Sequence, residues 1–263
     1  MSLLKLAIIG DGKMGRAVRD LAPEAGFTVV AFLGEQDVAN DGPKKEHLAG
    51  ADVAIEFTVP FAAATNVAAC ARAGVPVVCG TTGWDADRPG AETAVRQWSG
   101  AMLWAPNFSI GVHLFARTVQ RAAEEFARAH GEFAAQFIET HHVAKKDAPS
   151  GTAKLLAERV RPALGDVPIT SVRVGHAPGT HELILDGRFE QVRLVHEARD
   201  RRVFAAGALT AAKWLAGKKG IFTIDDIFGA RGWPPQPSLP GATRLWSPPL
   251  RPTARSTNRR IAR

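Results

Sequence analysis

LKLAIIGDGKMG (4–15) lies near the start of this chain and decides its fold class. The run 4–10 is apolar and ends in glycine, which is typical of a strand buried in a parallel sheet. The next residues fit the spacing GxGxxG and lead into a helical pattern over 13–21. A glycine turn between a strand and a helix predicts a site for the pyrophosphate of a dinucleotide, held at the helix N-terminus.

Each glycine of this turn has its own expected task. Gly10 permits the tight turn, Gly12 lets the backbone approach the phosphates, and Gly15 lets the helix and the strand pack closely. Glu35 follows at the expected distance for an acidic residue that binds the ribose, with a surface glutamate as the alternative. Lys13 would instead attract a 2′-phosphate, so the choice between NADH and NADPH stays open. The remaining loop residues expected to bind the cofactor are Asp11 and Met14.

Strand and helix patterns alternate as far as residue 107. Apolar runs predict strands at 27–33, 52–58, 75–80 and 101–107, with helices over 60–74 and 85–98. This alternation predicts a parallel sheet covered by helices on both faces. Ligands of such sheets bind beyond the carboxyl ends of the strands. Two loops there are expected to line the nicotinamide half of the site, unless they are ordinary turns: Gly80, Thr81 and Thr82, and Ala105, Pro106, Asn107 and Phe108.

The pattern changes after residue 108, where strands become grouped. Helices are expected at 109–129, 152–160 and 202–217, and strands at 133–142, 171–175, 181–185 and 189–198, the last two joined by a hairpin. The fold class is therefore α/β, with a Rossmann-type parallel-sheet domain and a smaller α+β domain. We expect residues 1–108 and 203–229 to form the dinucleotide-binding domain, 109–202 the substrate domain, and 230–263 a disordered tail.

The densest chemistry lies in ETHHVAKKDAPSGTAK (139–154). Its second half reads as a helix start, with Asp147 or Ser150 as the cap. Amide groups and hydroxyls at that helix end would bind a carboxylate, and the residues expected there are Ser150, Gly151 and Thr152. Lys145 adds a charge or a proton donor. His141 and His142 end a strand, so alternation predicts that only one of them faces a given pocket.

These features predict one chemistry. A dinucleotide delivers hydride, a positioned lysine or histidine supplies the proton, and the helix start holds a carboxylate. Adjacent histidines without a matching set of cysteines or carboxylates do not predict a metal site. No Ser-His-Asp or Cys-His arrangement is recognisable in the sequence. The residues by themselves predict a reductase of a small carboxylic acid.

HHxxKxDAPSGTA, present at 141–153, resembles the signature of the dihydrodipicolinate (4-hydroxy-tetrahydrodipicolinate) reductase family. The glycine turn, EFT (56–58), GTTG (80–83), APNFS (105–109) and HEARDRRVFAAGA (196–208) match it in the same order. The resemblance implies a Rossmann domain, a mixed-sheet substrate domain that forms homotetramers, and NAD(P)H-dependent reduction of a cyclic dicarboxylate in diaminopimelate and lysine biosynthesis. It also implies roles for His141 as proton donor or acceptor, Lys145 as proton donor, and His142, Gly151 and Thr152 as substrate contacts.

Composition limits the remaining classes. The net charge of +7 comes from residues 230–263, which hold seven arginines and no acidic residue, while the other 229 residues carry 26 basic and 26 acidic side chains. We expect that segment to be a solvated appendage or a weak anion-binding arm, and nucleic-acid binding is not favoured. The sequence has no apolar run long enough for a membrane span. The spacing of Cys70 and Cys79 predicts reduced thiols in a cytoplasmic protein.

Overall fold

The computed structural model of the chain describes residues 3–38, 41–129 and 131–229. The predicted tail, 230–263, lies outside the described residues. The chain divides into a compact unit, Met1–Ile227, and a second segment, Phe228–Arg263, and both sheets belong to the first unit. Within the described residues, no helix is both long enough and apolar enough to cross a membrane.

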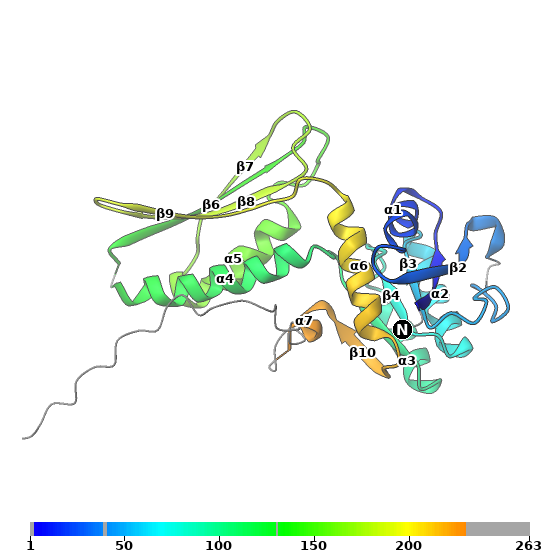
Figure 1. Cartoon of the computed structure of the whole chain (residues 1–263). Coiled ribbons are helices and arrows are strands. Elements are labelled where there is room, and N and C mark those ends of the chain that lie inside the picture. Colours follow the sequence, from blue (N-terminus) through cyan, green and yellow to red (C-terminus); the bar gives the residue numbers. More distant parts are fainter. Residues whose placement is uncertain (1–2, 39–40, 130, 230–263) are drawn as a thin grey trace, which may run out of the picture. The chain divides into compact units, whose positions relative to one another are not determined.

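Six parallel strands form the first sheet (Figure 1). They are β1 (Leu4–Ile9), β2 (Phe27–Leu33), β3 (Val53–Glu56), β4 (Val77–Cys79), β5 (Ala101–Trp104) and β10 (Gly220–Thr223), in the order β10-β5-β4-β3-β1-β2. Every residue of β3 and β4 is buried, as expected for strands covered on both faces. The strand order reverses at β1, so the glycine turn after β1 lies where such sheets bind ligands.

Helices cover this sheet in two pairs. In one pair, α1 (Lys13–Leu21) packs against α6 (Arg202–Leu215), and in the other α2 (Pro60–Ala73) packs against α3 (Arg88–Gln97). A short helix, η1 (Glu35–Asp37), follows β2, and α7 (Ile224–Ile227) follows β10. The expected Rossmann-type sheet is confirmed. The strand β10 was not predicted, because its sequence GIFT has only two consecutive apolar residues and none of them is fully buried; it is a strand through its pairing with β5.

Four strands form the second, mixed sheet, in the order β7-β6-β8-β9. The strands β6 (Phe133–His141) and β7 (Ile169–Arg173) are parallel, whereas β8 (Thr180–Gly187) is antiparallel to both β6 and β9 (Gln191–Glu197). The expected hairpin after residue 185 is confirmed by the pairing of β8 with β9. Two helices, α4 (Ile110–Phe126, followed by η2, Ala127–Ala129) and α5 (Gly151–Leu164), lie along one face of this sheet (Figure 1).

The apolar core of this layer lies between the sheet and the two helices. Phe137 and Leu183 come from the sheet, and Val119 and Leu156 come from the helices. The helix α5 continues past the predicted end at residue 160. Its buried stripe reaches the half-buried Leu164, and the helix stops at Gly165, which adopts a positive φ of 72° that favours glycine.

Candidate active site

One cross-strand row of polar side chains crosses the whole second sheet. The register places Glu139 of β6 opposite Ser171 of β7 and His181 of β8, and places His181 opposite His196 of β9. His141 lies two residues after Glu139 and opposite Arg173. Because side chains alternate along a strand, Glu139 and His141 point to the same face as the buried Phe137, which is the face covered by α4 and α5.

Glu139 is the centre of this row. Its side chain is 1% exposed, and several hydrogen-bond donors satisfy its carboxylate. His141 contacts Oε2 through Nδ1, Arg173 donates to Oε1 from Nη2 at 2.7 Å, and the backbone N–H of Ser150 donates to Oε1 at 3.3 Å. Burial raises the pKa of Glu139, but the hydrogen bonds from Arg173 and Ser171 and the charge of His141 outweigh burial and bring the pKa to about 2. The carboxylate is therefore ionised at neutral pH.

Burial keeps the surrounding histidines neutral. The ring centroids of His141 and His181 lie 5.2 Å apart, and those of His181 and His196 lie 6.4 Å apart. Burial, followed by the charge of His141, lowers the pKa of His181 to about 4. Burial also lowers the pKa of His141 below its usual value, although the neighbouring Glu139 opposes that shift. Among the described residues, the buried Nδ1 atoms of His181 and His196 have no hydrogen-bond partner. Protonation of either ring would therefore bury a positive charge without a partner, which costs free energy.

The start of α5 lies over this row. Ser150 is the N-cap: its Oγ accepts from the Ala153 N–H at 3.2 Å and contacts His181 Nε2 at 3.3 Å. The prediction of a cap at Asp147 or Ser150 is thereby decided in favour of Ser150. Gly151 is exposed and Thr152 is half-buried. This first turn lies at the positive end of a helix, which favours an anionic ligand, and the exposed Gly151 leaves room for one.

The loop between β6 and α5 carries the other expected residues. Lys145 Nζ pairs with Asp147 Oδ1 at 2.7 Å, and its side chain is 23% exposed. This hydrogen bond from Lys145 lowers the pKa of Asp147. Of the two adjacent histidines, His141 is buried within the network and His142 is half-buried. The adjacent Lys146 is exposed.

The glycine turn has the geometry that its sequence predicts. Gly10 has a φ of +108°, and a Cβ there would overlap the backbone oxygen of Phe57. A Cβ on Gly15 would overlap the Gly10 oxygen, so helix and strand approach too closely for any other residue. By contrast, nothing lies within 4 Å of the Cβ position of Gly12, which caps α1 and leaves open space at the helix N-terminus. These residues fit a dinucleotide pyrophosphate.

The two other predicted loops meet around Phe57. A Cβ on Gly80 would overlap the Phe57 ring, and the ring centroid of Phe108 lies 6.2 Å from that of Phe57. Thr81 is buried and accepts from the Thr58 N–H at 2.8 Å, so its hydroxyl joins two strand ends. The adjacent Thr82 is exposed. The loop 79–84 is thus ordered by contacts to its neighbours and leaves one threonine accessible.

The loop after β5 reaches the start of α5. Ala105 and Phe108 are buried and Pro106 is exposed. Asn107 Nδ2 donates to Thr152 Oγ1 at 3.3 Å, and Asn107 Oδ1 accepts from the Ser109 N–H at 2.7 Å. One asparagine therefore connects a loop expected to bind the cofactor with the helix start expected to bind the substrate.

Carboxylates gather at the ends of β1 and β2. Glu35 is exposed in the first turn of η1, and Asp37 Oδ2 accepts from the Gly34 N–H at 2.8 Å. A Cβ on Gly34 would lie 3.0 Å from Asp11 Oδ2, so the exposed Asp11 carboxylate lies against the end of β2. Lys13 and Met14 occupy the first turn of α1, with Lys13 exposed and Met14 half-buried.

Glu139, His141 and His181 each offer an atom within 4.8 Å of the others, a spacing that one cation can span. Here Arg173 already supplies a cation to Glu139, and Lys145 adds its charge to the surroundings of His141. The arrangement therefore reads as a hydrogen-bonded network. Its members Glu139, Arg173, His181 and His196 were not singled out from the sequence, although the spacing of Glu139 and His141 by two residues was a usable signal.

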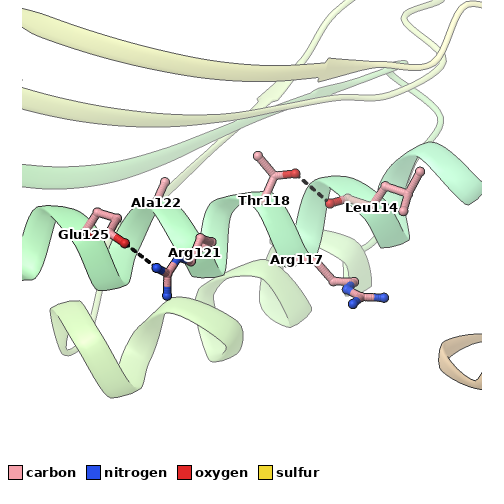
Figure 2. Close-up of a pocket in the computed structure, with 6 residues that line it drawn as sticks. All are labelled: Leu114, Arg117, Thr118, Arg121, Ala122 and Glu125. Carbon is pink, nitrogen blue, oxygen red and sulfur yellow. Dashed lines mark hydrogen bonds and ion pairs between the residues drawn. The ribbon is translucent and has the colours of Figure 1, made fainter. Parts of the chain in front are cut away.

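A hollow on the surface lies elsewhere, along α4. It has a volume of about 520 Å³ and is lined by Leu114, Arg117, Thr118, Arg121, Ala122 and Glu125 (Figure 2). All six residues come from one helix, and Arg121 pairs with Glu125 at 2.6 Å. None of the predicted site residues lines this hollow, and its lining offers neither a glycine turn nor a histidine.

Comparison with known families decides the identity. The model for dihydrodipicolinate reductase, N-terminus, matches residues 4–108, and the model for dihydrodipicolinate reductase, C-terminus, matches residues 111–228. The chain belongs to the dihydrodipicolinate reductase family. The resemblance inferred from HHxxKxDAPSGTA is therefore confirmed, and so is the expected oxidoreductase activity. Members of this family are pyridine-nucleotide-dependent reductases with a Rossmann fold.

Individual relatives agree over nearly their whole length. The 4-hydroxy-tetrahydrodipicolinate reductase of Christiangramia forsetii is 32% identical over 237 residues, which cover 85% of this chain and 97% of the relative. The enzyme of the same name from Xanthomonas euvesicatoria is 39% identical and covers 86% and 98%. A structure of dipicolinate-bound dihydrodipicolinate reductase from Paenisporosarcina superposes with a TM-score of 0.68 at 23% identity, over 84% of this chain and 97% of that one. It shows the same fold.

The neutral histidines give this reductase an expected pH-dependent stability. His181 has a pKa of about 4 in the fold and an ordinary value of 6.5 when exposed. Between these values the unfolded chain binds the proton more tightly, so the free energy of unfolding decreases as the pH falls from 6.5 to 4, by up to roughly 3 kcal/mol. The measurement is urea unfolding between pH 5 and 7 for the natural protein and for His181→Gln, which should show a smaller pH slope. His176→Gln, at an exposed loop position, is the control. An equal dependence of the free energy of unfolding on pH in all three proteins would contradict the lowered pKa of His181.

Proposed function

We propose that this chain catalyses the NAD(P)H-dependent reduction of 4-hydroxy-tetrahydrodipicolinate to tetrahydrodipicolinate, in diaminopimelate and lysine biosynthesis, with His141 and Lys145 handling protons. Family membership supports the reaction. One observation supports the residue roles: the strand end with His141 and the capped helix start at Ser150 share a single buried carboxylate, Glu139. Proton transfer and anion binding are thereby held next to each other.

The helix start is the proposed site for a substrate carboxylate. Ser150, Gly151 and Thr152 lie at the positive end of a fourteen-residue helix, where Thr152 adds a backbone amide and a hydroxyl. A small cyclic dicarboxylate fits this chemistry, and the Paenisporosarcina relative is described as dipicolinate-bound. The half-buried His142 would contact the substrate edge at the opposite side of the loop.

The proton comes from the loop after β6. The 4-hydroxyl group of the substrate must leave as water, and the nicotinamide, when bound, would supply the hydride that forms the new C–H bond. The negative charge that develops favours proton donation from Lys145, whose ammonium is held in place by Asp147. His141 is neutral, with Nδ1 directed at Glu139, which leaves Nε2 available for a proton of the substrate. No metal has a task in this scheme.

The cofactor contacts follow from the geometry of three loops. Gly10, Gly12 and Gly15 would hold the pyrophosphate, and the loops around Gly80 and Asn107 would hold the nicotinamide. Near the ribose, the carboxylates of Asp11, Glu35 and Asp37 would repel a 2′-phosphate, and Lys13 offsets only one of them. We infer that NADH is preferred over NADPH.

A single assay tests both statements. The protein is mixed with freshly prepared 4-hydroxy-tetrahydrodipicolinate, made by the synthase that catalyses the preceding step of the pathway. Oxidation of NADH and of NADPH is then followed side by side. We expect both to be oxidised, with the larger kcat/KM for NADH. Oxidation of neither would overturn the proposed function, while a larger kcat/KM for NADPH would overturn the cofactor preference alone.

The uncovered face of the second sheet is the proposed oligomer interface. No described helix covers this face, and it exposes Val172, Val174 and Val195. Apolar side chains on an open sheet favour association of copies. We propose a homotetramer formed through this face, in a cytoplasmic setting that suits the two free thiols. Light scattering at micromolar concentration tests the assembly, and a monomeric mass would contradict it.

A further inference from the structure

Glu139 is a buried carboxylate, and burying its charge costs free energy that an apolar side chain at the same position would not cost. Its neighbour on the same face, Phe137, packs into the core, whereas Glu139 needs its hydrogen-bond donors to offset the cost of removing a charge from water. A buried carboxylate at this position is explained if the groups that are hydrogen-bonded to it depend on its charge. Two of its partners, His141 and the helix start at Ser150, belong to the proposed reaction site.

The contact with His141 determines where that ring carries its proton. A carboxylate only accepts hydrogen bonds, so the neutral imidazole must keep its proton on Nδ1 and donate it to Glu139. Nε2 is then the free nitrogen. It lies beside Gly179, where a Cβ would be 3.0 Å from Nε2. The absence of a side chain at Gly179 therefore leaves room for the His141 ring.

The other oxygen of the carboxylate holds the rest of the site. Oε1 accepts from Ser150 N–H and from Arg173 Nη2. The same Nη2 also donates to the Asp147 carbonyl at 2.6 Å, so Arg173 connects the loop that carries Lys145 to the sheet. Both donors at Oε1 require an acceptor, and neither can act as one.

We propose that Glu139 is a positioning residue that sets the Nδ1–H tautomer of His141 and, through Oε1, aligns the helix start and the Lys145 loop with it. The assignment deepens the proposed function, because it concerns the histidine given a proton-handling role there. The charged and titratable groups facing His141 are Glu139 on its own strand, Arg173 on β7, His181 on β8 and Lys145 in the following loop.

Glu139→Gln separates this role from simple packing. The side chain keeps its shape, and its oxygen must face Arg173 and Ser150, because both are donors. Its amide nitrogen then faces His141 Nδ1, which has to accept a hydrogen bond and moves the ring proton to Nε2. The changed tautomer withdraws the free lone pair from the substrate side. We expect kcat to fall by about 100-fold and KM to change by less than about threefold, since a proton-transfer step is affected while the helix start at Ser150 keeps its donors.

The direct readout is the ¹⁵N spectrum of histidine-labelled protein at pH 7.5, with the His141 signals identified from a His141→Asn variant. The natural protein should show His141 as the Nδ1–H tautomer and Glu139→Gln should show Nε2–H, while Glu182→Gln, the same change on the opposite face of the sheet, leaves the His141 signals as they were. Glu139→Asp, which keeps the charge, should recover part of kcat. These spectra are independent of turnover, so a failed assay would not be mistaken for a failed assignment. An Nε2–H tautomer in the natural protein overturns the proposal even if Glu139→Gln does not fold, and so does a loss of activity in Glu139→Gln without a tautomer change.

Discussion

Replacing Lys145 with alanine is expected to lower kcat by about 10²- to 10⁴-fold, the usual contribution of a positioned acid. Lys145 is the cation of the loop between β6 and α5 that pairs with Asp147, and its side chain is 23% exposed, so it has both a fixed position and access to a ligand. Without its ammonium, the negative charge left by hydride addition has no nearby proton. Stopped-flow or steady-state oxidation of NADH measures the loss.

Cofactor binding should remain nearly unchanged in Lys145→Ala. The loops expected to bind the dinucleotide follow β1, β4 and β5, whereas Lys145 follows β6 in the other sheet. Fluorescence titration with NADH gives the dissociation constant directly. Lys146→Ala is the matched control, because Lys146 is the adjacent lysine but is exposed, and its turnover should stay within twofold of the natural protein. Turnover of Lys145→Ala similar to the natural protein would remove Lys145 from the reaction.

The second large effect is expected from Gly207→Ala. Gly207 lies in α6, where an added Cβ would overlap the carbonyl oxygen of Phe108 and lie 2.8 Å from its carbonyl carbon. These are backbone atoms, so the helix or the loop 105–109 must move. Overpacking costs about 1–3 kcal/mol or more, which exceeds the gain of about 1 kcal/mol for alanine over glycine in a helix. We expect a Tm lower by about 5 °C.

Loss of cofactor affinity should accompany that loss of stability. The displaced loop contains Asn107, which connects to Thr152, so its movement disturbs the expected nicotinamide site. Gly90→Ala is the control: Gly90 is also helical, in α3, and nothing lies within 4 Å of its Cβ position. That variant should be equally or more stable, with unchanged NADH affinity. A Gly207→Ala protein with the Tm and the NADH affinity of the natural protein would show that the contact with Phe108 is not constraining.

Local patterns were sufficient where function depends on neighbours along the chain. The turn at Gly10–Gly15 and the cap at Ser150 depend on a few consecutive residues, and glycine conformation and side-chain capping are properties of such short segments. The same holds for the long strands and helices, whose period shows in the sequence. The domain boundaries and the roles of the site residues stay predictions.

The sequence by itself determined the fold class, the dinucleotide turn, the Ser-Gly-Thr helix start and the family, because each is carried by residues adjacent in the chain. Only the tertiary structure decided that Glu139 joins His141, Arg173 and Ser150, and that His181 and His196 extend the row. The physical reason is strand register: β7, β8 and β9 bring these side chains together from positions up to 57 residues apart (139 to 196), and pairing of that kind leaves no local pattern. Short β10 was missed for the same reason, since only its pairing with β5 makes it a strand.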